Sequence, residues 1–248
     1  MAQVHAVVQA GGLGQRIRAA ANDTPKPMLS VGGVPIIERL VQQIVGAGIR
    51  RMTVVIGPNG ASIRSRITRL SATLPADLEL TFFEERNALG NAGALAELDT
   101  GDDDVLLCFA DLVTDIDFAM LVGVHRDRRR DITLTSHYEH HQLTLGELRV
   151  DGDVVHGYLE KPRKSFLICS GIAIFDARAI AVARAMPRPY GISNLVLAAI
   201  DAGCSVTHWL HGAYWIDVNT PELLERARGD AARAASAHVE PVIRRQAG

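Results

Sequence analysis

Short apolar runs alternate with longer segments of helical periodicity through most of this chain of 248 residues. Val4–Val8 predicts a strand, and apolar positions at helical spacing after Pro35 predict a helix over 36–45. Further segments fit the same alternation: strands at Met52–Ile56, Leu78–Phe83 and Val105–Phe109, and a helix through Ile63, Ile67 and Leu70. Strands alternating with helices require right-handed crossovers. We therefore predict an α/β fold with a doubly wound, mostly parallel, Rossmann-like sheet.

The middle third of the chain has a different pattern, with β-type runs and little helix between them. These runs are Asp131–Ser136, Glu147–Val150, Val154–Leu159 and Phe166–Phe175. We expect a small antiparallel β insertion there, packed beside the parallel sheet. Thr220 and Pro221 are an N-cap and first-turn pair for a helix to about Ala237. We predict one domain over 1–228, with a β-rich lobe at about 131–175, and a helix end and loose tail over 229–248.

Composition excludes several classes of protein. The net charge is −2, without the basic excess of a nucleic-acid binder. No apolar run approaches the roughly 20 residues that span a bilayer, and the first strand begins too early for a secretion signal. The three cysteines are far apart and make no zinc-type pair. We expect a cytoplasmic protein with no nucleic-acid or membrane partner, and a homodimer is the assembly to test.

A glycine-rich loop follows the first strand, and cations stand close behind it. The loop holds Ala10, Gly11, Gly12, Gly14 and Arg16, and Lys26 follows between two prolines. Glycines let successive backbone N–H groups approach phosphate oxygens. The loop lacks the G-K-[ST] ending of a P-loop and the dinucleotide G-x-G-x-x-G pattern. Together with both cations it predicts a site for a nucleoside triphosphate.

Two carboxylates lie where other apolar runs end. Asp111 follows Val105–Phe109, and Asp217 follows Trp215-Ile216. Ligands of an open parallel sheet bind beyond the carboxyl ends of its strands. Two carboxylates at that edge predict a Mg²⁺ site completed by substrate phosphates. The alternative is that each one only caps a turn or a helix.

Five motifs in order resemble the sugar-1-phosphate nucleotidyltransferases over residues 4–225. They are the loop Ala10–Arg16 with Pro25-Lys26-Pro27, then Leu89–Leu95, Phe109–Asp111, Leu159–Pro162 and Trp215–Asp217. The resemblance implies condensation of a nucleoside triphosphate with a sugar 1-phosphate, with Mg²⁺, to a nucleotide-sugar and pyrophosphate. It also implies that the β-rich lobe binds the sugar.

The resemblance also assigns roles to residues. Arg16 and the loop residues Ala10, Gly11, Gly12 and Gly14 would hold the triphosphate, completed by Gly90 and Asn91. Lys26 would reach the α-phosphate or the leaving group, and Lys161 the attacking sugar phosphate. Asp111 and Asp217 would hold Mg²⁺. Glu160 and Gly146 match positions that contact sugar hydroxyls.

The nucleobase is indicated by Glu85. Thymidylyl and uridylyl members commonly carry glutamine at this position, five residues before the glycine that matches Gly90. A carboxylate only accepts hydrogen bonds, and guanine offers adjacent N1–H and N2–H donors. The local run also resembles the branch that guanylylates mannose- or heptose-1-phosphate. We favour GTP. The alternatives are cytidylyl, thymidylyl or uridylyl transfer to a sugar, cyclitol or polyol phosphate, with Glu84 and Glu85 only a solvated acidic pair.

The acceptor and the class of activity stay open. Cys169-Ser170-Gly171 stands where many members have Asn-Ala-Gly, and a thiol is a poor partner for a sugar hydroxyl. A heptose or a cyclitol phosphate is therefore an alternative to an ordinary hexose for a site that includes Cys169 and Ser170. A non-catalytic nucleotide-sensing subunit is the alternative of another class. His137, His140 and His141 are expected on a solvated or partner-facing β surface rather than in a metal cluster.

Overall fold

The computed structural model describes residues 3–12 and 24–243, with side chains to Ala234; residues 1–2, 13–23 and 244–248 lie outside the description. A seven-stranded sheet forms the centre, in the order β12-β8-β11-β6-β1-β4-β5. In that order the strands are Val206–Leu210, Ile132–Gln142, Arg163–Phe175, Asp104–Phe109, Val4–Gln9, Arg51–Ile56 and Glu79–Glu84. Only β11 runs against its neighbours β6 and β8. The α/β fold with a mostly parallel sheet is confirmed.

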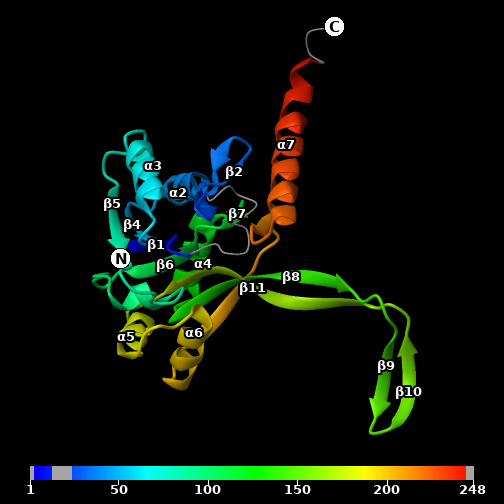
Figure 1. Cartoon of the computed structure of the whole chain (residues 1–248). Helices are drawn as coiled ribbons and strands as arrows, with labels where there is room; N and C mark the ends of the chain where they lie inside the picture. The colour runs from blue at the N-terminus through cyan, green and yellow to red at the C-terminus, as the bar shows by residue number, and fades with distance from the viewer. Residues whose placement is uncertain (1–2, 13–23, 244–248) are drawn as a thin grey trace.

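Helices cover both faces of the sheet (Figure 1). On one face α2 (Ile36–Gly46), α3 (Ala61–Ser71) and α4 (Phe118–Arg128) pack on the inward residues of the strands. On the other face lie η3 (Gly93–Ala96), α5 (Ala177–Ala185) and α6 (Ile192–Asp201). Successive strand residues point to opposite faces, so a strand between two helical layers is apolar at every position. This explains the mainly apolar sequences of β1, β4 and β6, in which the buried polar residues His5 and Thr53 lie within hydrogen-bond distance of each other, at 2.8 Å.

The antiparallel segments differ from the expectation that they pack beside the sheet. The first half of β8 and the last residues of β11 are strands of the main sheet, with Ile132 paired to Phe175. Beyond it the same two strands continue as a two-stranded ribbon, followed by a separate hairpin of β9 (Glu147–Asp151) and β10 (Val154–Leu159). In Figure 1 ribbon and hairpin project from the body. Burial explains the division, because side chains near Ile132 and Phe175 are covered by helices and those of the ribbon are not.

A smaller core joins the end of the chain to the body. It contains β2 (Ser30–Val31), β3 (Val34–Pro35), β7 (Leu112–Thr114), β13 (Trp215–Asp217) and the start of α7 (Pro221–Ile243). The hydroxyl of Thr220 accepts from the backbone N–H of Leu223 at 3.3 Å, as expected for an N-cap. The helix continues past Ala237 to Ile243, so residue 228 lies inside it. Within the described part of the chain, no helix combines the length and apolar character needed to cross a membrane.

Gly90 is required by a close backbone approach. Its φ is +85°, and a Cβ there would lie 2.1 Å from the carbonyl oxygen of Tyr190. We expect Gly90→Ala to lower the free energy of unfolding by about 2–4 kcal/mol, because strain and overlap act together. Urea denaturation measures the change. Gly123→Ala, in an exposed turn of α4 with no atom within 4 Å of the added Cβ, is the control and should not destabilise; equal behaviour of both variants would contradict the assignment.

Candidate active site

Lys26 is the centre of a charged cluster at the carboxyl edge of the sheet. Its side chain is 7% exposed. Its Nζ donates to Asp111 Oδ2 at 2.6 Å and to Asn219 Oδ1 at 2.5 Å, and lies 3.4 Å from Asp217 Oδ1. Asn219 also donates to Asp217. The structure thus brings together three residues that the sequence singled out and adds a fourth, Asn219, that it did not.

Local structure explains why these groups meet. Asp111 lies two residues after the buried strand β6 and directly before β7. Strand β13 pairs with β7 so that Asp217 lies opposite Leu112, and the N–H of Val218 donates to the carbonyl of Asp111 at 3.1 Å. Lys26 begins the short helix η2 (Lys26–Met28). Pro25 and Pro27 each have a fixed φ, so the backbone on both sides of Lys26 is restricted, and with it the direction of the lysine side chain.

The cluster has more negative than positive charge. Two carboxylates face one ammonium group, and burial, followed by the charge of Asp111, raises the pKa of Asp217. Lys26 and Asn219 act in the opposite direction. All the acceptors are hard oxygen atoms, which Mg²⁺ prefers. Asp111 and Asp217 therefore fit a divalent cation whose remaining ligands come from elsewhere; among the described residues no group of three or more His, Cys, Asp or Glu side chains could hold a metal.

The described part of the glycine loop lies beside a buried carboxylate. The N–H of Ala10 donates to Val55 at 2.8 Å, which continues the sheet into the loop. Glu85 is 8% exposed, and its Oε2 accepts from Gln9 Nε2 at 3.3 Å. A Cβ on Gly11 would lie 2.3 Å from that same oxygen, whereas Gly12 has open space around it. Glycine at position 11 is thus needed for the close approach of loop and carboxylate. Gly14 and Arg16 lie outside the described residues.

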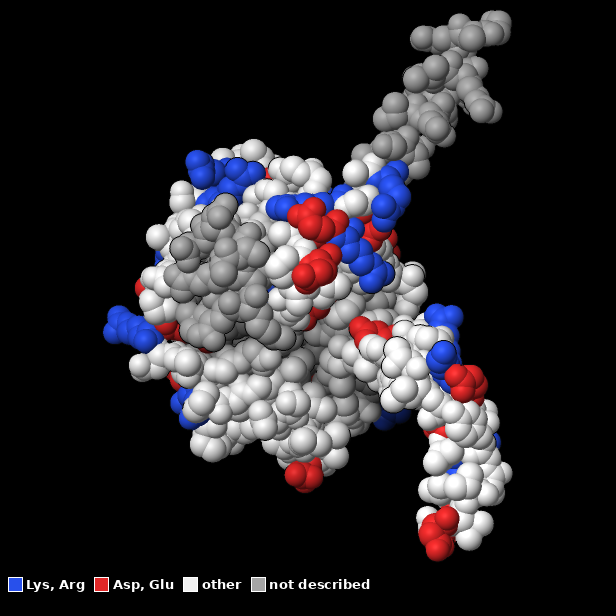
Figure 2. Space-filling view, turned by 45° about the vertical axis from the view of Figure 1, so that its right-hand side comes forward, with Lys and Arg blue, Asp and Glu red and all other residues white. Residues whose placement is uncertain are grey.

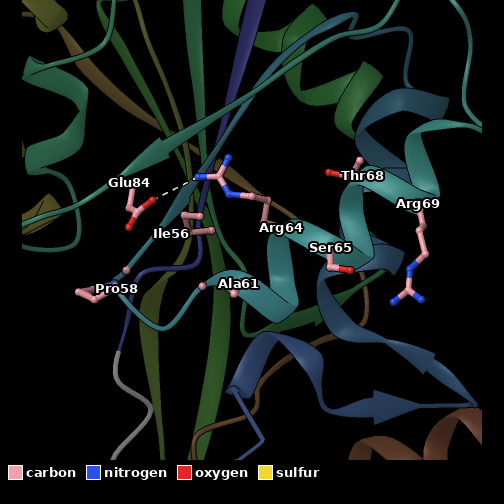
Figure 3. A pocket seen from close by; sticks show the side chains of 10 residues that line it. Ile56, Pro58, Ala61, Arg64, Ser65, Thr68, Arg69 and Glu84 are labelled. Atoms are coloured by element: carbon pink, nitrogen blue, oxygen red, sulfur yellow. Dashed lines mark hydrogen bonds and ion pairs between the residues drawn. The ribbon is translucent and has the colours of Figure 1, made fainter.

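Glu85 has an unsatisfied acceptor. Its Oε1 is buried and has no hydrogen-bond partner among the described residues. Burial raises the pKa of Glu85, against a smaller lowering by Gln9. The neighbour Glu84 points to the other side, into a cavity of about 400 Å³ beside α3, where it pairs with Arg64 at 3.4 Å (Figure 3). The interpretation as a solvated acidic pair therefore fits Glu84 but not Glu85.

Asn91 has a structural partner. Its side-chain oxygen accepts from the N–H of Ile192 at 2.8 Å, at the start of α6. The N–H of Tyr190 donates to Leu89 at 3.0 Å, so the segment around Gly90 is held against the segment before α6. The nucleotide-binding role predicted for Gly90 and Asn91 stays a prediction.

Ser170 is fully buried between two histidines. Its hydroxyl lies 2.8 Å from His137 Nδ1 and 2.8 Å from His211 Nε2, and its carbonyl accepts from Trp215 Nε1 at 2.8 Å. The rings of His137 and Trp215 lie 4.4 Å apart. The expectation of a solvated surface is therefore wrong for His137; its stacking on a residue 78 positions away could not be read from the strand pattern. Cys169, next to Ser170, is exposed.

A hollow of about 500 Å³ lies against this group. It is lined by His137, Tyr138, Trp215 and the segment 210–213. Trp215 and Asp217 are neighbours on one face of β13, so the hollow adjoins the charged cluster. Burial and the nearby His137 lower the pKa of His211, which favours a neutral ring at its wall. No sequence pattern indicated a role for His211.

The remaining predicted residues lie on the projecting part of the chain. Glu160 and Lys161 follow β10, both exposed, with Lys161 Nζ 3.7 Å from Glu160. Lys161 is eight residues before Cys169, a separation of about 25 Å along extended chain. Gly146 lies under the Tyr158 side chain. No described contact joins Glu160, Lys161 or Gly146 to the Lys26 cluster.

The comparisons with known proteins agree with this geometry. A family model described as "Nucleotidyl transferase" matches residues 5–233. The chain belongs to the nucleotidyl transferase family. Among its relatives, a mannose-1-phosphate guanylyltransferase of Mycobacterium tuberculosis is 28% identical over 93% of this chain and 65% of its own length. A glucose-1-phosphate thymidylyltransferase of Streptomyces antibioticus is 30% identical over 89% of this chain and 64% of its own.

The chain spans just under two thirds of the length of these curated nucleotidyl transferases. A solved structure from Bacillus anthracis, described as a putative glucose-1-phosphate thymidylyltransferase, superposes with a TM-score of 0.72 at 20% identity. It covers 92% of this chain and 95% of that one. The shared fold accounts for the placement of the glycine loop, Asp111 and Asp217 at one edge of the sheet.

Proposed function

We propose that the protein transfers a nucleotidyl group from a nucleoside triphosphate to a sugar or sugar-like 1-phosphate. The observation that carries the proposal is the convergence of Asp111 and Asp217 on the buried ammonium of Lys26. A protein that only binds nucleotide does not need such an arrangement. The named activities of the curated relatives, guanylyl and thymidylyl transfer to sugar 1-phosphates, are of this kind.

The reaction needs positioning and charge neutralisation rather than a covalent nucleophile. An oxygen of the acceptor phosphate forms a bond to the α-phosphorus while the opposite bond breaks and its electron pair leaves with pyrophosphate. Bound by Asp111 and Asp217, Mg²⁺ would neutralise the phosphates that must approach each other. Lys26 would hold the α-phosphate or the leaving group, and Arg16 with the glycine loop the rest of the triphosphate.

The acceptor's body would occupy the hollow beside Trp215. An indole face with imidazole and backbone groups around it suits a polyhydroxylated ring, since binding pockets combine aromatic walls with a few polar groups. A hexose, a heptose or a cyclitol phosphate fits this description. Lys161 can contact the acceptor phosphate only when the ribbon that carries it bends toward the cluster.

We infer that the base is guanine, because Glu85, at the wall of the glycine loop, offers a buried acceptor that has no partner among the described residues. Guanine N1–H and N2–H would satisfy it. Thymine or uracil would place a carbonyl near the carboxylate, at a cost of about 1–3 kcal/mol. Pyrophosphate release, measured for GTP, CTP, UTP, ATP and dTTP with mannose- and heptose-1-phosphate, tests the base. Turnover with CTP alone would contradict the guanine assignment.

Glu85→Gln is expected to lower kcat/KM for GTP by about 10- to 100-fold. Its amide presents a donor as well as an acceptor, so turnover of dTTP or UTP should rise relative to GTP. Glu84→Gln, one residue away on the other face of β5, is the matched control and should leave kcat/KM for GTP within about twofold.

The pH dependence provides a second measurement. Because burial raises the pKa of Glu85, the carboxylate required by guanine is lost as the pH falls through that raised value. KM for GTP should therefore increase toward acid pH in the native protein, and this increase should be weaker in Glu85→Gln. Identical pH profiles for KM would contradict the assignment of Glu85 to the base.

A further inference from the structure

The hairpin β9–β10 has a mainly apolar, exposed face, on which Tyr158 lies against Gly146. Across the hairpin Tyr158 pairs with Leu148, and Val155 with Val150, with a β-bulge between Val155 and Gly157. Directly paired residues share a face, and Leu148 and Val150 are two positions apart on β9, so these four side chains lie on the same face. They are 62%, 53%, 55% and 53% exposed, and they belong to none of the described core clusters.

The opposite face of the hairpin carries charged side chains. Arg149 and Asp151 point there, opposite Gly157 and Val154. The hairpin is therefore amphipathic, like a strand pair with one face in a core and one in solvent. A two-stranded hairpin is at best marginally stable alone in water, so such a face requires a covering surface.

The size of the exposed surface fits a protein interface. Four large side chains, each about half exposed, present several hundred Å² of apolar surface, and isolated patches of that size mark interaction sites. A stable interface needs about 800 Å² from each partner. Tyr138 and Leu167 contribute a further exposed pair across the adjoining ribbon.

Charge along the hairpin is arranged in a self-complementary way. The turn at its free end carries Asp151 and Asp153, whereas the base, where β10 leads into β11, carries Lys161, Arg163 and Lys164. Lys161 pairs there with Glu160 at 3.7 Å and Lys164 with Glu147 at 2.5 Å, so the base has a net charge of +1. Figure 2 shows acidic side chains at the free end of this arm, Lys and Arg nearer the body and mainly uncharged surface between. In an antiparallel pair of hairpins each acidic end would meet the basic base of the other.

From these features we propose that the apolar face of β9–β10 binds the same face of a second copy of this chain, with the two hairpins antiparallel. An identical hairpin provides a matching uncharged face together with the opposite charge at each end. An anionic membrane surface fits less well, because the free end would bring Asp151 and Asp153 to it. The proposal does not depend on the reaction that the protein catalyses.

Sedimentation velocity of the full chain tests the interface. We expect a dimer whose dissociation constant rises at least about tenfold in Val155→Lys, since a charge would be buried at the centre of the face. Val154→Lys is the matched control: the same change one residue earlier, on the other face opposite Asp151. It should leave the dissociation constant within about twofold. A native chain that stays monomeric up to about 100 µM, or equal effects of the two variants, would overturn the proposal.

Charge reversal tests the antiparallel arrangement. Asp153→Lys and Arg163→Asp should each weaken the dimer by bringing like charges together. The double variant restores opposite charges, because the free end of one copy meets the base of the other, and should recover most of the affinity. Failure of the double variant to recover would overturn the antiparallel pairing, and thermal melting by circular dichroism establishes that each variant is folded.

Discussion

Asp111→Asn is expected to reduce nucleotidyl transfer by roughly 1,000-fold or more. The substitution keeps the shape of the side chain and its acceptor oxygen but removes the charge that lies 2.6 Å from Lys26 Nζ. It leaves Asp217 as the only carboxylate in the cluster, so the affinity for Mg²⁺ falls together with the ability to neutralise two phosphorylated substrates. Pyrophosphate release at increasing Mg²⁺ concentration measures both effects.

A matched control is available in Asp103→Asn. Asp103 also accepts from a cation, Arg51 Nη1, at 2.7 Å, but at the other end of β4 from the glycine loop. This variant should keep the native turnover and its Mg²⁺ dependence. Unchanged turnover in Asp111→Asn would remove Asp111 from the mechanism and would favour a protein that binds nucleotide without reacting it.

Lys26→Met is expected to impair both activity and stability. The ammonium separates two carboxylates in a partly buried site, and removing one partner of such a cluster costs about 2–4 kcal/mol at neutral pH. Turnover should fall by about 100- to 1,000-fold, because the cation at the reacting phosphates is lost. Lys164→Met is the control, since Lys164 pairs with Glu147 on the projecting ribbon, away from the cluster.

The loss of stability in Lys26→Met should depend on pH in a defined direction. Burial and the charge of Asp111 raise the pKa of Asp217, and Lys26 opposes that increase, so without the cation the pKa of Asp217 in the folded state lies further above that of the unfolded chain. The folded variant then binds more protons, so its free energy of unfolding decreases as the pH rises through that raised pKa. Denaturation at several pH values should show the deficit shrinking toward pH 4. A deficit independent of pH would contradict the charge explanation.

Periodicity predicted the elements whose burial is regular. The strands β1, β4 and β6 were predictable because helices cover both of their faces, and α2 and α3 because they bury one stripe. The edge strand β5 is less buried, and its short apolar run was sufficient to predict it. The helices over 118–128, 177–185 and 192–201 were not predicted. The sequence of α5, for example, alternates alanine with arginine and short apolar residues, so no stripe distinguishes its inward face before it packs.

The site was predictable where residues follow strands and unpredictable where distant segments meet. Asp111 follows β6 and Asp217 follows an apolar run, so their position at the sheet edge could be expected. Asn219 could not, because its bond to Lys26 joins positions 193 residues apart. The prediction that the antiparallel segments pack beside the sheet was wrong for a related reason. An alternating pattern shows that one face of a strand is apolar, but it does not show which surface covers that face.

The pairing of β7 with β13 also determines at what stage of synthesis and folding the site can form. Lys26 and Asp217 are 191 positions apart, and Asp217 is placed only by that pairing. Contacts between such distant segments form late, since the entropy of closing the long loop must be lost before they contribute. A growing polypeptide can therefore build the parallel sheet and its glycine loop while still lacking half of its carboxylates. The proposed active centre is completed only after residues 215–219 have left the ribosome, so chains shortened before them that retain the loop and Lys26 should be folded in part and inert.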